Sequence, residues 1–240
     1  MHPPDPGRRR WVGSAGIAAL GGLMAGVPRA ALADEERSTD VLAVEDLMRE
    51  HGVLRRALLV YAEAATRLRS RQAIPAEALH RAAALFRRFG EDYHERSLEE
   101  RHVFPALIIA GGTLTTICRT LAAQHQRGRQ LTDYILATSA GHGVGRSAMD
   151  PLAAALAGLV RMYQHHAAIE DTVVFPAWKK TLTAPRYSEL SEQFEALEQK
   201  MVGRDGFEGA VGQIHAIEQA FGLADLAALT AAPPPAAPAR

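Results

Sequence analysis

The chain has 240 residues, of which 48% are hydrophobic, and its 27 basic residues balance its 27 acidic ones. This length allows one or two compact domains with a sizeable core. Because the formal net charge is zero, nothing favours a nucleic acid or an acidic surface as a partner, and we expect no nucleic acid to bind.

Residues 1–33 have the features of an export signal. Arginines at positions 8–10 precede an apolar run from Val12 to Val27, which is rich in glycine and alanine and too short for a convincing membrane span. Ala31-Leu32-Ala33 then offers an A-x-A cleavage site. The consecutive arginines resemble a bacterial twin-arginine signal. We therefore expect a periplasmic protein without stable membrane insertion after cleavage, the alternative being an uncleaved anchor.

Helical periodicity persists through the rest of the chain, and strand signals are nearly absent. We predict four long helices, from about Thr39 to Arg69, from Ala76 to the break at Gly111-Gly112, from Thr113 to Ser139, and from Pro151 onward. Since the connections are short, neighbouring helices are expected to run in opposite directions. The prediction is therefore an all-α fold, an antiparallel up-down four-helix bundle over residues 34–184.

Two shorter helices are predicted after Pro185, from Ser188 to Met201 and from Phe207 to Phe221. They form a C-terminal helical extension over residues 185–228. Because they are too short and too amphipathic to form a domain of their own, we expect them to pack on the bundle or to mediate association, including homo-oligomerisation. Residues 229–240 are rich in alanine and proline, which is typical of a disordered tail.

Three histidines occupy core positions of the predicted helices. His51 lies in line with Leu47 at the helical step of four, and His125 follows Leu121 in the same way. His166 continues the apolar seam of the fourth helix, which is expected to run on to Val173, and Glu170 follows His166 four residues later. Residues four apart lie about 40° apart on a helix surface, so the last two side chains project side by side.

A histidine–carboxylate pattern ending on Val-Phe-Pro occurs twice, at residues 93–105 and 163–176. Burying carboxylates and imidazoles in a bundle core costs several kcal/mol unless something compensates them. Six such residues directed at one core layer would need a cation. The mixture of imidazole and carboxylate suits iron, manganese or zinc. Six candidate ligands exceed the four of a tetrahedral zinc site, which favours a dinuclear centre.

These segments, together with Glu50-His51 and Gln124-His125, resemble the hemerythrin-like HHE cation-binding domain, in the form found in exported bacterial members. The resemblance covers roughly Val41 to Leu182. It implies a four-helix bundle that holds a non-haem diiron centre, with two iron ions as the cofactor. By motif position, the implied metal ligands are His51, His94, Glu99, His125, His166 and Glu170.

The first copy of the pattern departs from the His-x-x-x-Glu spacing that is usual in the family. His94 and Glu99 are five residues apart, which places them about 140° apart on a regular α-helix. Either a π-bulge lies between them, as is common at functional sites, or Glu95 takes the place of the histidine. The second copy offers a similar choice between His165 and His166, and the position on the seam favours His166.

The leading functional hypothesis is a metal-binding protein that binds or responds to dioxygen, or to a related small ligand such as nitric oxide or peroxide. Leu54, Leu121, Leu159 and Ile169 are expected to exclude water from the centre. A second hypothesis is enzymatic, namely a diiron oxidase, a peroxidase or an iron-donating repair protein. A third is a helical interaction module that holds no metal.

Overall fold

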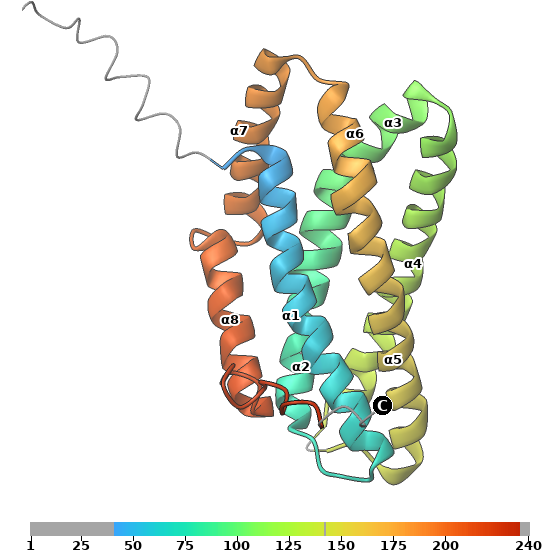
Figure 1. Ribbon diagram of the computed structural model, residues 1–240, viewed down its shortest axis with the longest axis vertical. Coiled ribbons are helices and arrows are strands. Elements are labelled where there is room, and N and C mark those ends of the chain that lie inside the picture. The colour runs from blue at the N-terminus through green and yellow to red at the C-terminus, as the bar shows by residue number, and fades with distance from the viewer. Residues whose placement is uncertain (1–40, 142, 236–240) are drawn as a thin grey trace, which may run out of the picture. The chain divides into compact units, whose positions relative to one another are not determined.

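The structure is a computed structural model that describes residues 41–141 and 143–235. Within these ranges the regular secondary structure is entirely helical, which confirms the all-α prediction (Figure 1). The predicted export signal, the predicted helix start at Thr39 and residues 236–240 of the predicted tail lie outside the described ranges.

The helical elements join into six rods. Their bounds are α1, Ala43–Arg69; α2, Ala76–Leu85, continued by η2, Phe86–Val103, and α3, Phe104–Ala110; α4, Thr113–Ser139; α5, Arg146–Ile169, continued by η3, Glu170–Val174, and α6, Phe175–Lys180; α7, Ala184–Met201; and α8, Gly206–Phe221. The four long rods lie side by side (Figure 1), with α1 against α5, α4 against α5, and the second rod against α4. None of the helices in the described part of the chain is long and apolar enough to cross a membrane.

The break between the second and third rods depends on two glycines. Gly111 has φ 83° and Gly112 has φ 72°. Residues with a Cβ rarely adopt positive φ values of this size. The start of the fourth rod differs from the prediction, because α5 begins at Arg146 and Pro151 lies inside the helix. Pro151 lies in the second turn of α5, where a proline removes one backbone hydrogen bond and crowds the carbonyl four residues before it. The helix nevertheless begins before it, at Arg146.

The second and fourth rods change their hydrogen bonding before each Phe-Pro pair. Both η2 and η3 are π-helical, and the N–H of Phe104 bonds to the carbonyl of Glu99, five residues back. The N–H of Phe175 bonds in the same way to the carbonyl of Glu170. In an α-helix the proline ring would clash with the carbonyl four residues before it. The wider π turn relieves this clash, so the Phe-Pro pairs help to place the π segments.

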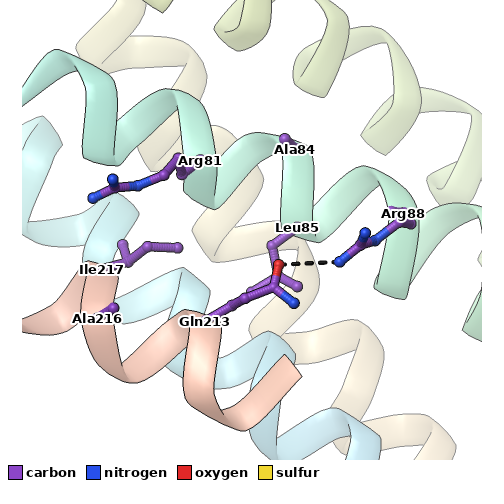
Figure 2. A pocket seen from close by; sticks show the side chains of 7 residues that line it. All are labelled: Arg81, Ala84, Leu85, Arg88, Gln213, Ala216 and Ile217. Carbon is purple, nitrogen blue, oxygen red and sulfur yellow. Dashed lines mark hydrogen bonds between the residues drawn. The ribbon is translucent and has the colours of Figure 1, made fainter. Parts of the chain in front are cut away.

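The two C-terminal helices pack on the long rods, α7 against α1 and η2, and α8 against α1 and α2. Arg56 on α1 donates two hydrogen bonds to Glu218 on α8, at 2.8 and 2.5 Å. A pocket of about 360 Å³ lies between α8 and the second rod, where Arg88 Nη2 donates to Gln213 Oε1 at 3.0 Å (Figure 2). Packing on the long rods, one of the two expected roles of these helices, is therefore observed.

Candidate metal centre

The six predicted ligands converge in the core from all four long rods. His51 comes from α1, and His94 and Glu99 come from η2. His125 comes from α4, whereas His166 and Glu170 lie at the junction of α5 and η3. All six side chains are buried, and none is more than 3% exposed. They form two groups of possible ligands that share Glu99.

The first group joins α1 to η2. His51 Nε2 and His94 Nε2 are 3.1 Å apart. His94 Nε2 lies 3.3 Å from Glu99 Oε1, and His51 Nε2 lies 3.5 Å from Glu170 Oε2. The ligand atoms of His51, His94 and Glu99 therefore lie within 4.8 Å of one another, and an oxygen of Glu170 lies beside His51.

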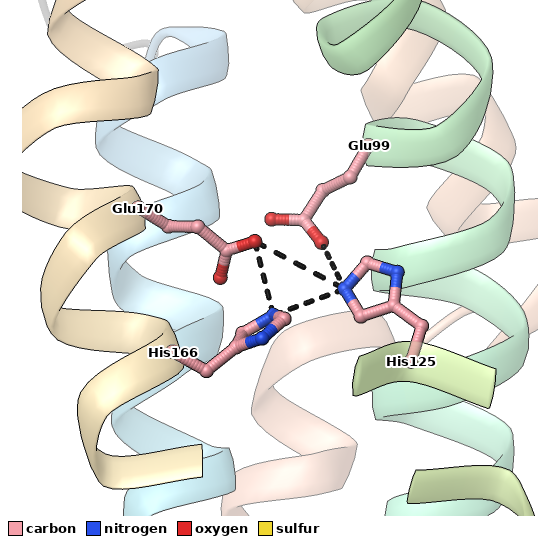
Figure 3. Close-up of side chains that lie close together, drawn as sticks. All are labelled: Glu99, His125, His166 and Glu170. Atoms are coloured by element: carbon pink, nitrogen blue, oxygen red, sulfur yellow. Dashed lines mark hydrogen bonds and ion pairs between the residues drawn. The ribbon is translucent and has the colours of Figure 1, made fainter. Parts of the chain in front are cut away.

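The second group joins α4 to the fourth rod (Figure 3). His125 Nε2 and His166 Nε2 are 3.0 Å apart. His125 Nε2 lies 3.3 Å from Glu99 Oε2, and His166 Nε2 lies 3.0 Å from Glu170 Oε1. Each carboxylate thus presents one oxygen to the first group and the other to the second, which is the arrangement that bridges two cations.

Each of the four histidines has its other ring nitrogen beside an acceptor on a different helix. The Nδ1–acceptor distances are 2.7 Å for His51 to Asp171, 2.5 Å for His94 to Glu50, 2.9 Å for His125 to Glu100, and 2.9 Å for His166 to Gln124. An Nδ1–H that donates outward leaves the lone pair on Nε2 directed at the centre. Metal-binding histidines are oriented in this way.

Sequence reasoning did not assign a role to these four acceptors. Each is adjacent to a predicted ligand in the chain but contacts a histidine on another helix, so the pairing depends on how the helices pack. In the sequence, two of the acceptors are visible as the residues before His51 and His125. The other two are the acids that directly follow Glu99 and Glu170. Arg55 pairs with Asp171, and Arg129 pairs with Glu100, so each arginine holds one acceptor in place.

The carboxylates of Glu99 and Glu170 supply the test of whether a cation fits. Both are fully buried, and none of their four oxygens makes a hydrogen bond within the described part of the chain. Burying an ionised carboxylate without partners is costly, whereas coordination to a cation satisfies it. The residues present therefore fit a metal centre.

Protons compete with cations in this cluster. Burial alone would raise the pKa of Glu99, but attraction by the imidazoles of His94 and His125 holds it well below its usual range. Burial alone would lower the pKa of His94, but the carboxylates of Glu99 and Glu50 raise it well above its usual range. The metal-free cluster thus favours a proton on His94, which a bound cation would displace.

The structure distinguishes between the alternative ligand positions in both copies of the pattern. A π-helical segment, one of the two alternatives for His94 and Glu99, is present, and it brings both residues to one face. Glu95 is buried but turns aside, and accepts a hydrogen bond from Tyr163 at 2.6 Å. His165 is exposed, whereas His166 is in the cluster.

Two predictions about the second copy are wrong. Val173 was placed on the seam, but it is 37% exposed and Val174 is buried instead. The π turn of η3 is wider than an α turn and delays the next core position by one residue. Ile169, predicted to exclude water, is 41% exposed, whereas Leu54, Leu121 and Leu159 are buried as expected.

The sequence matches the hemerythrin HHE cation binding domain over residues 42–178. The chain belongs to this family. Three mycobacterial proteins, two from strains of Mycobacterium tuberculosis and one from Mycobacterium bovis, are each 46% identical to it over 196 residues, which is 81% of this chain and 76% of theirs. All three are named as uncharacterized proteins. No solved structure matches.

Membership of the HHE family and the buried histidine–carboxylate groups together indicate a metal-binding protein. The cavity at the cluster has a volume of only about 10 Å³, which is about the space needed for one water molecule. Larger pockets of the HHE protein lie elsewhere, and the one between α8 and the second rod is lined by arginine, glutamine and apolar side chains rather than by metal ligands (Figure 2).

Proposed function

We propose that this HHE protein is a hemerythrin-like non-haem diiron protein that binds or responds to dioxygen or a related small ligand, such as nitric oxide or peroxide. The observation that carries the proposal is the pair of buried carboxylates, without hydrogen-bond partners, set between two pairs of inward-facing histidines. An antiparallel up-down four-helix bundle is the arrangement proposed for the long rods.

In this proposal His51 and His94 hold one iron ion, and His125 and His166 hold the other. Glu99 and Glu170, each with one oxygen near either histidine pair, would be shared by the two. Four nitrogens and four carboxylate oxygens supply about four ligand atoms to each ion, which leaves positions for a small exogenous ligand. Ferrous iron bound there would supply the electrons that reversible dioxygen binding requires.

The chain itself restricts what reaches the centre. Leu54, Leu121 and Leu159 are buried, and they limit the access of water to the cluster. The cavity at the cluster has space for about one water molecule and none for an organic substrate. This favours a binding protein over an oxidase that acts on a larger molecule. Based on residues 1–33, we also propose export to the periplasm.

The test is anaerobic reconstitution of the purified protein with ferrous iron, followed by metal analysis and an absorption spectrum before and after exposure to air. We expect about two irons per chain and a charge-transfer band that depends on dioxygen. Glu170→Ala should remove the band and lower the iron content, whereas Glu192→Ala, at an exposed site on α7, should change neither. An iron content below about one per chain in the unaltered protein contradicts the proposal.

A further assay separates binding from catalysis. If the iron-loaded protein turns over added peroxide steadily, and Glu170→Ala abolishes the turnover, the peroxidase alternative is correct. Binding predicts instead a spectral change that reverses when the small ligand is removed.

A further inference from the structure

The four histidines differ in the group that orients them. Asp171, Glu50 and Glu100 present carboxylates to His51, His94 and His125, whereas Gln124 presents a neutral amide oxygen to His166. Gln124 corresponds in the second half of the chain to Glu50 in the first, since each directly precedes a histidine of the cluster. The replacement of a carboxylate by an amide is therefore confined to one histidine.

This difference affects how strongly each imidazole donates to a cation. A carboxylate that accepts the Nδ1–H makes the ring more basic and strengthens Nε2 as a ligand. An amide oxygen carries no full charge, and its hydrogen bond is about half as strong. His166 is consequently the weakest nitrogen donor of the four.

Other charges near the second group leave this ranking in place. Glu95 Oε2 lies 3.9 Å from Nδ1 of His125. Its oxygens also face the Tyr163 hydroxyl at 2.6 Å and the Arg129 guanidinium at 3.5 Å. Glu95 therefore acts on His125, and the hydrogen bond to His166 comes from Gln124.

The same histidine lines a groove between α4 and α5. The α4–α5 groove, with a volume of about 250 Å³, is lined by Thr120, Gln124, His165, His166 and Ile169, among others. His166 also lines the small cavity at the cluster. It is thus the ligand that separates the groove from the centre.

We propose that the two metal positions are unequal, and that the ion held by His125 and His166 is the one that exchanges with solvent. Its path would run through the α4–α5 groove, which His166 separates from the centre. Gln124 is the positioning residue that makes His166 a weaker ligand than His94, whose ring faces the carboxylate of Glu50. The inference depends on the dinuclear centre proposed above.

The test measures metal release. The protein is loaded anaerobically with ferrous iron, its iron content is counted, and an excess of a chromogenic ferrous chelator is added. We expect two phases of equal amplitude whose rates differ by about tenfold or more. Gln124→Glu should slow the fast phase about tenfold and leave the slow phase unchanged. Gln126→Glu, at an exposed position of the same helix, adds the same charge and should change neither phase.

A second variant tests the path separately from donor strength. Thr120→Phe places a large side chain in the α4–α5 groove at an exposed position. It should slow both uptake and release of the fast ion while the equilibrium affinity stays within about twofold. Thermal unfolding of each variant checks that it remains folded.

Three results would overturn the inference. Release of both ions at one rate would show that the positions are equivalent. An effect of Gln124→Glu on the slow phase alone, or on neither phase, would show that Gln124 does not set the difference. An unaltered rate in Thr120→Phe would exclude the groove as the path. A count below two irons before chelation contradicts the dinuclear centre instead, so the two failures are distinguishable.

Discussion

Glu91 on η2 gives a stability prediction that can be worked out from the structure. Its carboxylate is fully buried, accepts a hydrogen bond from Thr132 at 2.6 Å, and lies 2.9 Å from the Arg87 guanidinium. Burial raises the pKa of Glu91 from its ordinary value of 4.5 to about 7, helped by the nearby Glu95 and opposed by Thr132 and Arg87. At about 1.4 kcal/mol for each pKa unit, the difference between 4.5 and about 7 means that ionisation of Glu91 costs the folded state about 3.5 kcal/mol.

The direction of the pH dependence of stability follows from which state, folded or unfolded, binds the proton of Glu91 more tightly. Because the folded protein holds the proton to higher pH than the unfolded chain does, the Glu91 contribution to stability is complete below about pH 4.5 and is lost as the pH rises through about 7. Glu91→Gln keeps an acceptor for Thr132 and removes this loss. The opposing attraction of Arg87 is already part of the pKa of about 7. The variant should therefore be more stable than the unaltered protein by about 3 kcal/mol at pH 8, with little or no advantage at pH 4.5.

Urea unfolding followed by far-ultraviolet circular dichroism, in the presence of a chelator, measures this difference at both pH values. Glu77→Gln removes the same charge at an exposed site on the same rod, and its effect should not depend on pH. A stability difference for Glu91→Gln that is equal at pH 4.5 and pH 8 would refute the assignment of the raised pKa to this carboxyl.

Three further predictions concern the centre and its surroundings. Removing the metal should lower the melting temperature by roughly 10–20 °C by calorimetry, because two ions each present at about 100 times their dissociation constant stabilise the fold by about 5 kcal/mol in total. Asp171→Asn should weaken metal binding at the His51 position by about 10–100-fold in a competition titration, whereas equal affinity would contradict its orienting role. A Cβ at Gly128 would lie 2.1 Å from the Tyr163 hydroxyl, so Gly128→Ala should destabilise by about 1–3 kcal/mol in urea unfolding, whereas Gly212→Ala, in open space, should not.

The sequence allowed most of the helical layout to be predicted, because the signals involved are local. The helix Thr113–Ser139 was predicted with the bounds that the structure has. The π-helix between His94 and Glu99 was also predictable, since two buried polar side chains five residues apart cannot share one face of an α-helix. In both cases the sequence spacing and the cost of burial leave few alternatives.

What could not be predicted depends on contacts between helices. Nothing in the spacing of His166 and Glu170 requires a π turn after them, so the shift from Val173 to Val174 was missed. The crossed pairing of Glu50 with His94 and of Gln124 with His166 was missed for a related reason. Such pairs depend on the rotation of each helix about its axis, which periodicity alone constrains only to within one side of the helix.

The two halves of the chain contribute the same types of residue to the centre, but with different local geometry. Each half supplies a histidine preceded by an acid or amide and a bridging carboxylate followed by an acid, but only the first half needs the long π-helix to bring its second histidine inward. Geometry therefore makes the two positions alike, because both histidine pairs have Nε2 atoms about 3 Å apart and share the same two carboxylates. A difference between the positions must then come from their surroundings, namely the α4–α5 groove and the groups behind the histidines. There the neutral amide of Gln124 takes the place that the carboxylate of Glu50 has in the first half. A change of one charge behind one ligand is enough to alter metal affinity without moving the ligand itself.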